Sequence, residues 1–259
     1  MSDPAAVRRG SLARLLSSRG FVRVADASLE LGVSEVTIRT DLTALERDGR
    51  AVRVHGGAMP VDGVLRESPV ESTRDERAEA KRAIGVVAAR QVASGDCVYL
   101  DAGSTALAVA EALLQRRDLN ELIVVTSALT IALALEPAIP RIEVVVTGGT
   151  LRPLQHSLVN PYAAPMLAGL RFDVAFIGCN GIHARHGVTN VNLPEAEIKT
   201  LALRSAQRSV LVADGGKLGR VDPAVIGTLS DFDQLITAGE AQPGAVNAVR
   251  TAGLDVVAA

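Results

Sequence analysis

The feature that most constrains the fold is an alternation of short apolar, strand-like runs with helical segments between residues 76 and 237. The strand-like runs are 97–100, 122–126, 142–147, 173–178, 209–213 and 234–237, and the helical segments are 76–92, 105–115, 128–135 and 194–208. Strands that alternate with helices form a mostly parallel sheet covered by helices on both faces. Apolar residues make up 48% of the chain and aromatic residues only 2%, which is typical of cores built from Val, Leu, Ile and Ala. We therefore predict an α/β fold for this part of the chain.

The first fifty residues show a different pattern, with three short helical segments in succession. The first has leucines at helical spacing within 12–16, the second covers 26–31, and Gly32 can take the left-handed conformation that ends a helix. Ser34 is a good N-cap for the third segment, which continues to about Arg47. Its apolar stripe consists of Ile38, Leu42 and Leu45. This spacing predicts a helix-turn-helix unit.

Residues 50–55 then alternate basic and apolar side chains as a strand does, and Gly56-Gly57 allows a tight reversal. We interpret this segment as a small β-wing and predict a winged helix-turn-helix domain over residues 1–58. A linker is expected over 59–75, since it contains Pro60, Gly63 and Pro69. The α/β domain then covers 76–259.

The third helix is suited to reading DNA, because side chains opposite its apolar stripe are small or polar and let a helix enter the major groove. These side chains belong to Val36, Thr37, Arg39, Thr40 and Thr43. The wing offers Arg50, Arg53 and His55 for contacts with phosphates. Residues 1–60 hold nine arginines against seven acidic residues, which agrees weakly with a nucleic-acid partner. The alternatives are an ordinary solvated helix face and a charged hairpin without a partner.

A candidate ligand site lies in the second domain, where a strand-like run meets a helical segment. Asp101, Gly103, Ser104 and Thr105 stand at this turn, where backbone N–H groups at a helix N-terminus can bind an anion. The same turn also fits a plain strand-to-helix connection. Glycines end two further strands, at Gly148-Gly149 and at 178–181, and allow close backbone approach at the same sheet edge. Two lysines, Lys199 and Lys217, would complete a site for an anionic ligand, although each also fits a surface position.

Nothing in the sequence indicates export or membrane insertion. The first ten residues lack an apolar signal region, and the longest apolar run, 128–135, is far shorter than a membrane span. Cys97 and Cys179 lie in apolar runs and are expected to be reduced thiols. His183 and His186 are three residues apart in a loop, where we expect solvent-exposed histidines rather than a metal site. We expect a cytoplasmic protein without metal or cofactor.

The segment 31–58, LGVSEVTIRTDLTALERDGRAVRVHGGA, closely resembles the DeoR family of bacterial regulators. In that family a VSxxTIRRDLxxLExxG segment is followed by a basic strand and HGGA. The resemblance implies that Ser34, Thr37, Arg39 and Thr40 face DNA. Thr40 stands where the family usually has a second arginine, so one cationic contact is replaced by a hydroxyl.

The resemblance continues through LDAGST, VVTSA, VVVTGG, DVAFIGCNGI, EAEIK and VLVADGGKLG, which look like the DeoR C-terminal sensor. That sensor is similar in fold to ribose-5-phosphate isomerase and CoA transferases, and the similarity implies a sugar-phosphate effector. The corresponding motif positions are Asp101, Gly103, Ser104, Thr105, Gly148, Gly149, Glu195, Lys199 and Lys217. Two departures stand out: Gly215-Gly216 replaces a common Ser-Ser pair, and Ser157 is followed by Asn160-Pro161 rather than by a glycine.

These patterns together predict a sequence-specific regulator that binds a double-stranded DNA operator as a homodimer or homotetramer. We expect a repressor of carbohydrate catabolic genes that is controlled by a phosphorylated sugar. One alternative is an enzyme that isomerises a sugar phosphate, which the DNA-reading domain disfavours. Another is a constitutive DNA-binding protein whose second domain only oligomerises.

Overall fold

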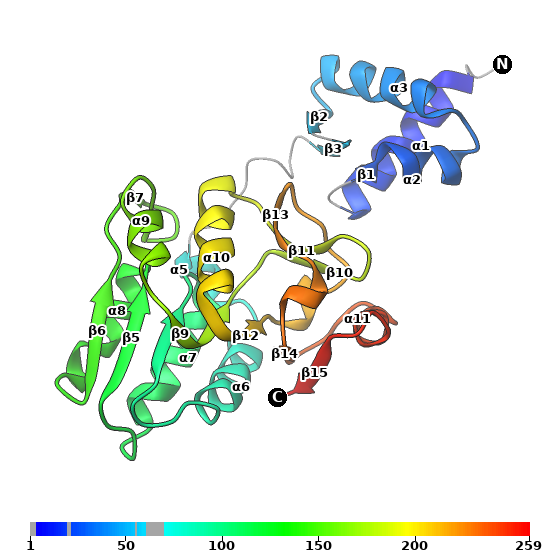
Figure 1. The fold of residues 1–259 in the computed structure, drawn as a ribbon. Helices are drawn as coiled ribbons and strands as arrows, with labels where there is room; N and C mark the ends of the chain where they lie inside the picture. The colour runs from blue at the N-terminus through cyan, green and yellow to red at the C-terminus, as the bar shows by residue number, and fades with distance from the viewer. Residues whose placement is uncertain (1–3, 20–21, 55, 61–69) are drawn as a thin grey trace.

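The structure of the protein is a computed structural model that describes residues 4–19, 22–54, 56–60 and 70–259. Three helices and a small antiparallel sheet form the N-terminal part, and a larger α/β part follows (Figure 1). The predicted fold class, a winged helix-turn-helix followed by a mostly parallel α/β domain, is therefore confirmed. Among the described residues, no helix is long and apolar enough to cross a membrane.

The helices of the N-terminal part are α1 (Pro4–Arg19), α2 (Val24–Leu31) and α3 (Glu35–Arg47), and its strands are β1 (Val22–Arg23), β2 (Ala51–Val54) and β3 (Gly57–Pro60). Gly32 ends α2 in the left-handed conformation, with a φ of 66°. Ser34 caps α3 by accepting a hydrogen bond from the backbone N–H of Thr37 at 3.2 Å. The turn predicted from Gly32 and Ser34 is thus the turn that the structure forms.

The N-terminal core lies between α1, α3 and the wing sheet. Its fully covered side chains include Leu12, Leu16, Ile38, Leu42 and Leu45, each of which stabilises the fold by roughly 1.5–3 kcal/mol on burial. An ion pair between Arg8 and the buried Asp41 joins α1 to α3 at 2.5 Å. The wing sheet is antiparallel with the order β1-β3-β2. Strand β1 was not predicted, because its two residues are too few to show the alternation of apolar and polar side chains that marks a strand.

The α/β part is organised around a seven-stranded parallel sheet with the order β15-β14-β12-β9-β4-β5-β6. Its strands are β4 (Cys97–Leu100), β5 (Leu122–Thr126), β6 (Ile142–Val146), β9 (Phe172–Ile177), β12 (Ala206–Val212), β14 (Gln234–Thr237) and β15 (Asp255–Ala258). From β4 the chain continues through β5 and β6 to one edge, whereas from β9 it continues through β12 and β14 to the other. The strand order therefore reverses between β4 and β9, and open α/β sheets bind ligands at such a point.

Helices cover both faces of this sheet (Figure 1). Helices α6 (Ala78–Ala89), α7 (Ser104–Gln115) and α8 (Leu129–Leu135) pack on one face, and α9 (Ala163–Ala168), α10 (Leu193–Ser205) and α11 (Ala245–Thr251) pack on the other. Close contact between α6 and α7 requires Gly85, because a Cβ at this position would lie 2.4 Å from the carbonyl oxygen of Ala108.

Several elements were not predicted from the sequence. A hairpin of β7 (Thr150–Arg152) and β8 (Ser157–Val159) follows β6. A second antiparallel sheet contains β10 (Gly181–His183), β11 (Gly187–Asn190) and β13 (Ala224–Gly227). The segment expected to be a linker ends in a six-residue helix, α5 (Val70–Asp75), whose Val70 is buried. Residues 61–69 of that segment lie outside the described residues.

Candidate functional site

A cavity of about 190 Å³ lies at the switch point, lined by residues that follow β4 and β9. Six of the residues singled out from the sequence line it: Gly103, Ser104, Thr105, Glu195, Lys199 and Lys217. They come from the turn after β4, from α10 and from the turn after β12. The structure thus brings together residues that lie up to 114 positions apart in the chain.

The N-terminus of α7 forms one wall of the cavity. Gly103 has a φ of 129°, a conformation that side chains other than glycine rarely adopt, and it precedes the first helical residue, Ser104. The first intrahelical bond runs from the N–H of Leu107 to the carbonyl of Gly103. The N–H groups of Ser104 and Thr105 precede this bond, so they can donate to a ligand, and the helix dipole favours a negative one.

Asp101 lies behind this wall rather than on it. Its carboxylate accepts hydrogen bonds from Lys199 Nζ and, at 2.9 Å, from the backbone N–H of Gly178. Both partners of the Asp101–Lys199 ion pair are almost fully covered. Desolvation by itself lowers the pKa of Lys199, but the charges of Asp101 and Glu195 outweigh it and raise that pKa above its usual value. Lys199 is therefore a fixed cation at the cavity, and Asp101 positions it.

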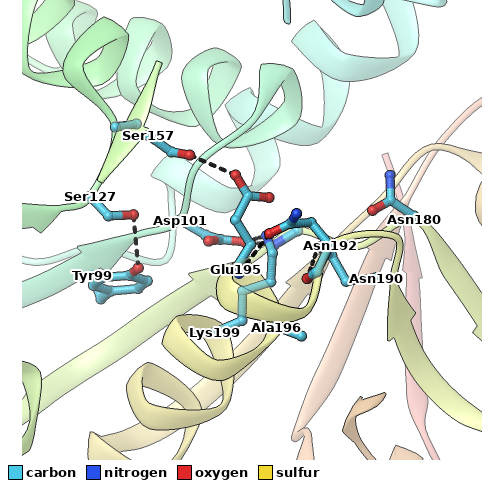
Figure 2. Close-up of polar contacts among 12 residues, drawn as sticks. Tyr99, Asp101, Ser127, Ser157, Asn180, Asn190, Asn192, Glu195, Ala196 and Lys199 are labelled. Atoms are coloured by element: carbon cyan, nitrogen blue, oxygen red, sulfur yellow. Dashed lines mark hydrogen bonds and ion pairs between the residues drawn. The ribbon is translucent and has the colours of Figure 1, made fainter. Parts of the chain in front are cut away.

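Glu195 enters the cavity from the first turn of α10. Asn192 caps this helix, because its side chain accepts a hydrogen bond from the N–H of Glu195 at 3.1 Å. The carboxylate accepts a hydrogen bond from Ser157 Oγ at 2.6 Å and pairs with Arg152. Figure 2 shows Glu195 and Lys199 on α10, with Ser157 reaching Glu195 from the β7–β8 hairpin. The negative charge of Glu195 is thus partly compensated, while its carboxylate remains able to accept hydrogen bonds from a ligand.

Three basic residues at the cavity were not anticipated: Arg77, Lys81 and Arg220. Arg77 pairs with Asp214 at 2.6 Å, and the buried Lys81 donates a hydrogen bond to the carbonyl of Thr73. Burial lowers the pKa of Lys81, and the nearby Asp214 opposes this effect. In the sequence these residues resemble ordinary surface cations, and only the packing of α6 places Arg77 and Lys81 beside α7.

The cavity carries an excess of positive charge. Among its lining residues are five basic side chains, those of Arg77, Lys81, Lys199, Lys217 and Arg220, against the three carboxylates of Glu76, Glu195 and Asp214. Uncharged polar groups complete the wall, including the side chains of Asn180 and Asn190. Burial raises the pKa of the lining residue Cys179 to about 12, so its thiol is neutral and unsuited to nucleophilic attack.

Gly148 and Gly149 were expected at the ligand site but do not line this cavity. They follow β6, the edge strand, two strands away from β4. Gly149 has a φ of 138°, and a Cβ there would lie 1.8 Å from the carbonyl oxygen of Val159. The backbone angle and this clash show that a glycine is needed at position 149, where the β7–β8 hairpin begins.

The predicted DNA-reading residues share one exposed surface on α3 and the wing. Arg39, Thr40, Thr43, Arg50 and Arg53 are all exposed. Arg39 pairs with Glu35 at 2.6 Å, one turn earlier in the helix. Arg53 Nη1 donates a hydrogen bond to Thr43 Oγ1 at 3.1 Å, so the wing contacts α3 directly.

Ser34 and Thr37 lie at the start of α3, with 2.9 Å between their hydroxyl oxygens. The hydroxyls of Thr40 and Thr43 donate to the carbonyls of Val36 and Arg39, respectively. His55 lies outside the described residues.

His183 and His186 occupy a contact between the two parts of the chain. Their rings stack at 4.5 Å, and His186 Nε2 lies 3.4 Å from Asp26 of α2. The side chain of His186 is only 9% exposed, so the expectation of solvent-exposed histidines is wrong for this residue. Among the described residues, no group of three or more potential metal ligands was found.

Two family descriptions match the chain. Residues 8–63 match a DeoR-like helix-turn-helix domain, and residues 76–238 match the DeoR C terminal sensor domain.

The HTH-type transcriptional regulator GlpR of Haloferax volcanii is 36% identical over 252 residues, with 97% of each chain covered. The HTH-type transcriptional regulator GolR of Listeria innocua is 32% identical, with 96% of each chain covered. A putative aga operon transcriptional repressor of Escherichia coli O157:H7 is 31% identical and covers 96% of this chain and 92% of its own.

Solved structures show more distant similarity. Ribose 5-phosphate isomerase A of Methanocaldococcus jannaschii is 15% identical with a TM-score of 0.41, over 55% of each chain. The full-length sorbitol operon regulator SorC of Klebsiella pneumoniae is also 15% identical, with a TM-score of 0.37, over 84% of this chain and 91% of its own.

Proposed function

The chain belongs to the DeoR family of transcriptional regulators, and from this premise we propose that it represses carbohydrate catabolic genes under the control of a small phosphorylated sugar. It is a DNA-binding regulator, since the family match includes the helix-turn-helix domain and the full-length relatives are named transcriptional regulators rather than enzymes.

The observation that carries the proposal is the excess of basic side chains around the N-terminus of α7. A phosphate there would accept hydrogen bonds from the N–H groups and hydroxyls of Ser104 and Thr105. Lys81 and Lys217 would supply charge-assisted contacts to the same group. A neutral sugar would not offset the excess of positive charge in the cavity, so a phosphorylated ligand fits better.

The opposite wall suits a hydroxylated carbon chain. Glu195 can accept hydrogen bonds from hydroxyls, while Asn180 and Asn190 can both donate and accept. The cavity of about 190 Å³ is smaller than the roughly 300–1,000 Å³ of pockets for drug-sized ligands. We therefore place a small phosphorylated sugar here, with its phosphate at α7 and its hydroxyls toward α10.

In the proposed complex with DNA, α3 enters the major groove and the wing contacts the backbone. Arg39, Thr40 and Thr43 would face base edges, and Arg50 and Arg53 would contact phosphates. Ser34 and Thr37 would lie at the end of α3 that first meets the groove. Repression relieved by the effector is the proposed direction of control, and one relative is named as a putative repressor.

The proposal is tested by calorimetry on the full chain with a panel of sugar phosphates and the matching unphosphorylated sugars. Only phosphorylated compounds should bind, and a binder should release labelled operator DNA in a fluorescence anisotropy titration. Lys217→Met should weaken binding by about ten- to a hundredfold, the equivalent of one charge-assisted hydrogen bond. Equal binding of sugars with and without phosphate would contradict the proposal, and so would turnover of a bound compound.

A further inference from the structure

Helix α5 is the first described element after residues 61–69, which connect it to the DNA-reading domain. It also forms part of the effector cavity, because Thr73 of α5 and Arg77 of the turn to α6 line it. Of the described elements of the α/β part, α5 is thus the nearest in the chain to the DNA-reading domain.

Two of the contacts that hold α5 and its turn to α6 involve cations of the cavity. Lys81 Nζ donates a hydrogen bond to the backbone carbonyl of Thr73, and Lys81 is buried. Arg77 Nη1 pairs with Asp214 at 2.6 Å, and Asp214 is buried as well. These two contacts lie on the cavity side of α5.

Two further contacts of α5 do not involve the cavity cations. The N–H of Val70 donates to the carbonyl of Leu154 in the β7–β8 turn at 2.8 Å. On the opposite side, Arg74 pairs with Glu111 of α7 at 2.6 Å, with both side chains exposed. An exposed ion pair of this kind contributes only about 0–1 kcal/mol. The two cavity-side contacts therefore add to the burial of Val70 and its hydrogen bond in keeping α5 in place.

The turn between α5 and α6 is strained. Arg77 has a φ of 52°, in the left-handed region that residues other than glycine adopt at a cost of roughly 1–3 kcal/mol. The Arg77–Asp214 pair favours this conformation. The pair also depends on Gly216, because a Cβ at that position would lie 1.6 Å from Arg77 Nη1.

We propose that α5 is the output element of the sensor, released when an oxyanion in the cavity takes over Lys81 and Arg77 from Thr73 and Asp214. This inference rests on the proposed function, since it assigns the effect of an anionic effector in the same cavity. An oxyanion carries the negative charge that the carbonyl of Thr73 lacks, so it competes with this carbonyl for the ammonium of Lys81. The effector then favours the state in which α5 is loose, and that difference in affinity is the coupling to the reader.

The test is amide hydrogen exchange on the full chain, with inorganic phosphate as the probe and sodium chloride at matched ionic strength as the control. Phosphate should slow exchange in the first turn of α7, residues 104–107, which reports binding. It should also raise exchange over residues 70–77 by about three- to tenfold, as expected for the loss of one hydrogen bond. Slower exchange in α7 with unchanged or slower exchange in α5 overturns the inference and leaves the proposed function standing. No change in either segment counts against both.

Two variants test the contacts themselves. Lys81→Met keeps the apolar stem but removes the donor, so exchange over residues 70–77 should be fast even without phosphate. Lys217→Met is the matched control: it also removes a cavity lysine, but no hydrogen bond from Lys217 to α5 is found among the described residues. This variant should weaken phosphate binding and leave exchange over residues 70–77 as slow as in the wild type without phosphate.

Gly216→Ala provides an independent variant if Lys81→Met does not fold. The three heavy atoms nearest to the new methyl group all belong to the end of the flexible Arg77 side chain, so it should displace the guanidinium from Asp214. We expect faster exchange in α5 without phosphate. Wild-type exchange in both Gly216→Ala and Lys81→Met would overturn the inference.

Discussion

Asp101 and Lys199 form an ion pair in which the two side chains are only 2% and 4% exposed, at the cavity beside the switch point of the sheet. Asp101 begins the turn after β4, and Lys199 lies on α10, 98 positions later in the chain. The pair therefore fixes α10 against the switch point of the sheet and sets the position of the cavity's most deeply buried cation. The two side chains therefore act as one ion pair, and not as two groups that each contact a ligand independently.

The first prediction follows from this pair. Lys199→Met should destabilise the protein by about 3–5 kcal/mol, because it leaves the carboxylate of Asp101 buried without its partner. Urea unfolding followed by circular dichroism measures the loss. The double variant Asp101→Asn with Lys199→Met should recover part of it, since the isolated charge is then absent. A loss below 1 kcal/mol in the single variant would show that water or another cation compensates Asp101.

The second prediction concerns the recognition helix. Arg39→Ala should reduce the preference for operator over random DNA by the roughly 1–3 kcal/mol of a good base contact. The fold should be unaffected, because Arg39 is exposed and its described partner is Glu35, also at the surface. Fluorescence anisotropy with both DNAs at a fixed salt concentration measures the effect, and Arg90→Ala at the exposed C-cap of α6 is the control. An unchanged preference would transfer base reading to Thr43 or the wing.

The third prediction is self-association. One short recognition helix covers too few base pairs for specificity in a genome, whereas a dimer reads two half-sites about 34 Å apart. We expect the α/β domain to carry the interface, since large apolar side chains such as Tyr162 and Leu193 are about 70% exposed there. Light scattering coupled to gel filtration should show a dimer or tetramer at micromolar concentration. A monomer both with and without DNA would defeat this prediction.

How far the sequence predicts the fold depends on the type of element. The buried parallel strands β4, β5 and β9 were recognisable, because both of their faces are covered and each reads as a continuous apolar run. Strands β10 and β11 were not, since they are three and four residues long and contain Gly181, Gly187 and polar side chains. Strand β10 pairs with β11, and β11 in turn pairs with β13, more than thirty residues later.

The same contrast applies to the candidate site. The turn 101–105 was recognisable, because a strand end, a glycine and two hydroxyl residues at a helix start are adjacent in the sequence. Lys81 and Arg77 join the site only through the packing of α6 on α7, which no local pattern indicates. Gly148 and Gly149 were grouped with the site because they end a strand, but the sequence does not reveal that β6 lies at the edge of the sheet.

The last prediction is a dependence of stability on pH from the contact between the two parts of the chain. Burial, the positive charge of Arg23 and the adjacent His183 lower the pKa of His186 from 6.5 to about 4, although Asp26 opposes the shift. The unfolded chain therefore binds a proton at His186 between about pH 6.5 and 4, where the folded chain does not. Stability from this residue is complete above pH 6.5 and is lost as the pH falls toward 4. Thermal melting should show that the decrease in Tm from pH 7 to pH 5 is smaller in His186→Asn than in the wild type, because asparagine does not titrate. An identical decrease in both proteins would mean that His186 is not buried in solution.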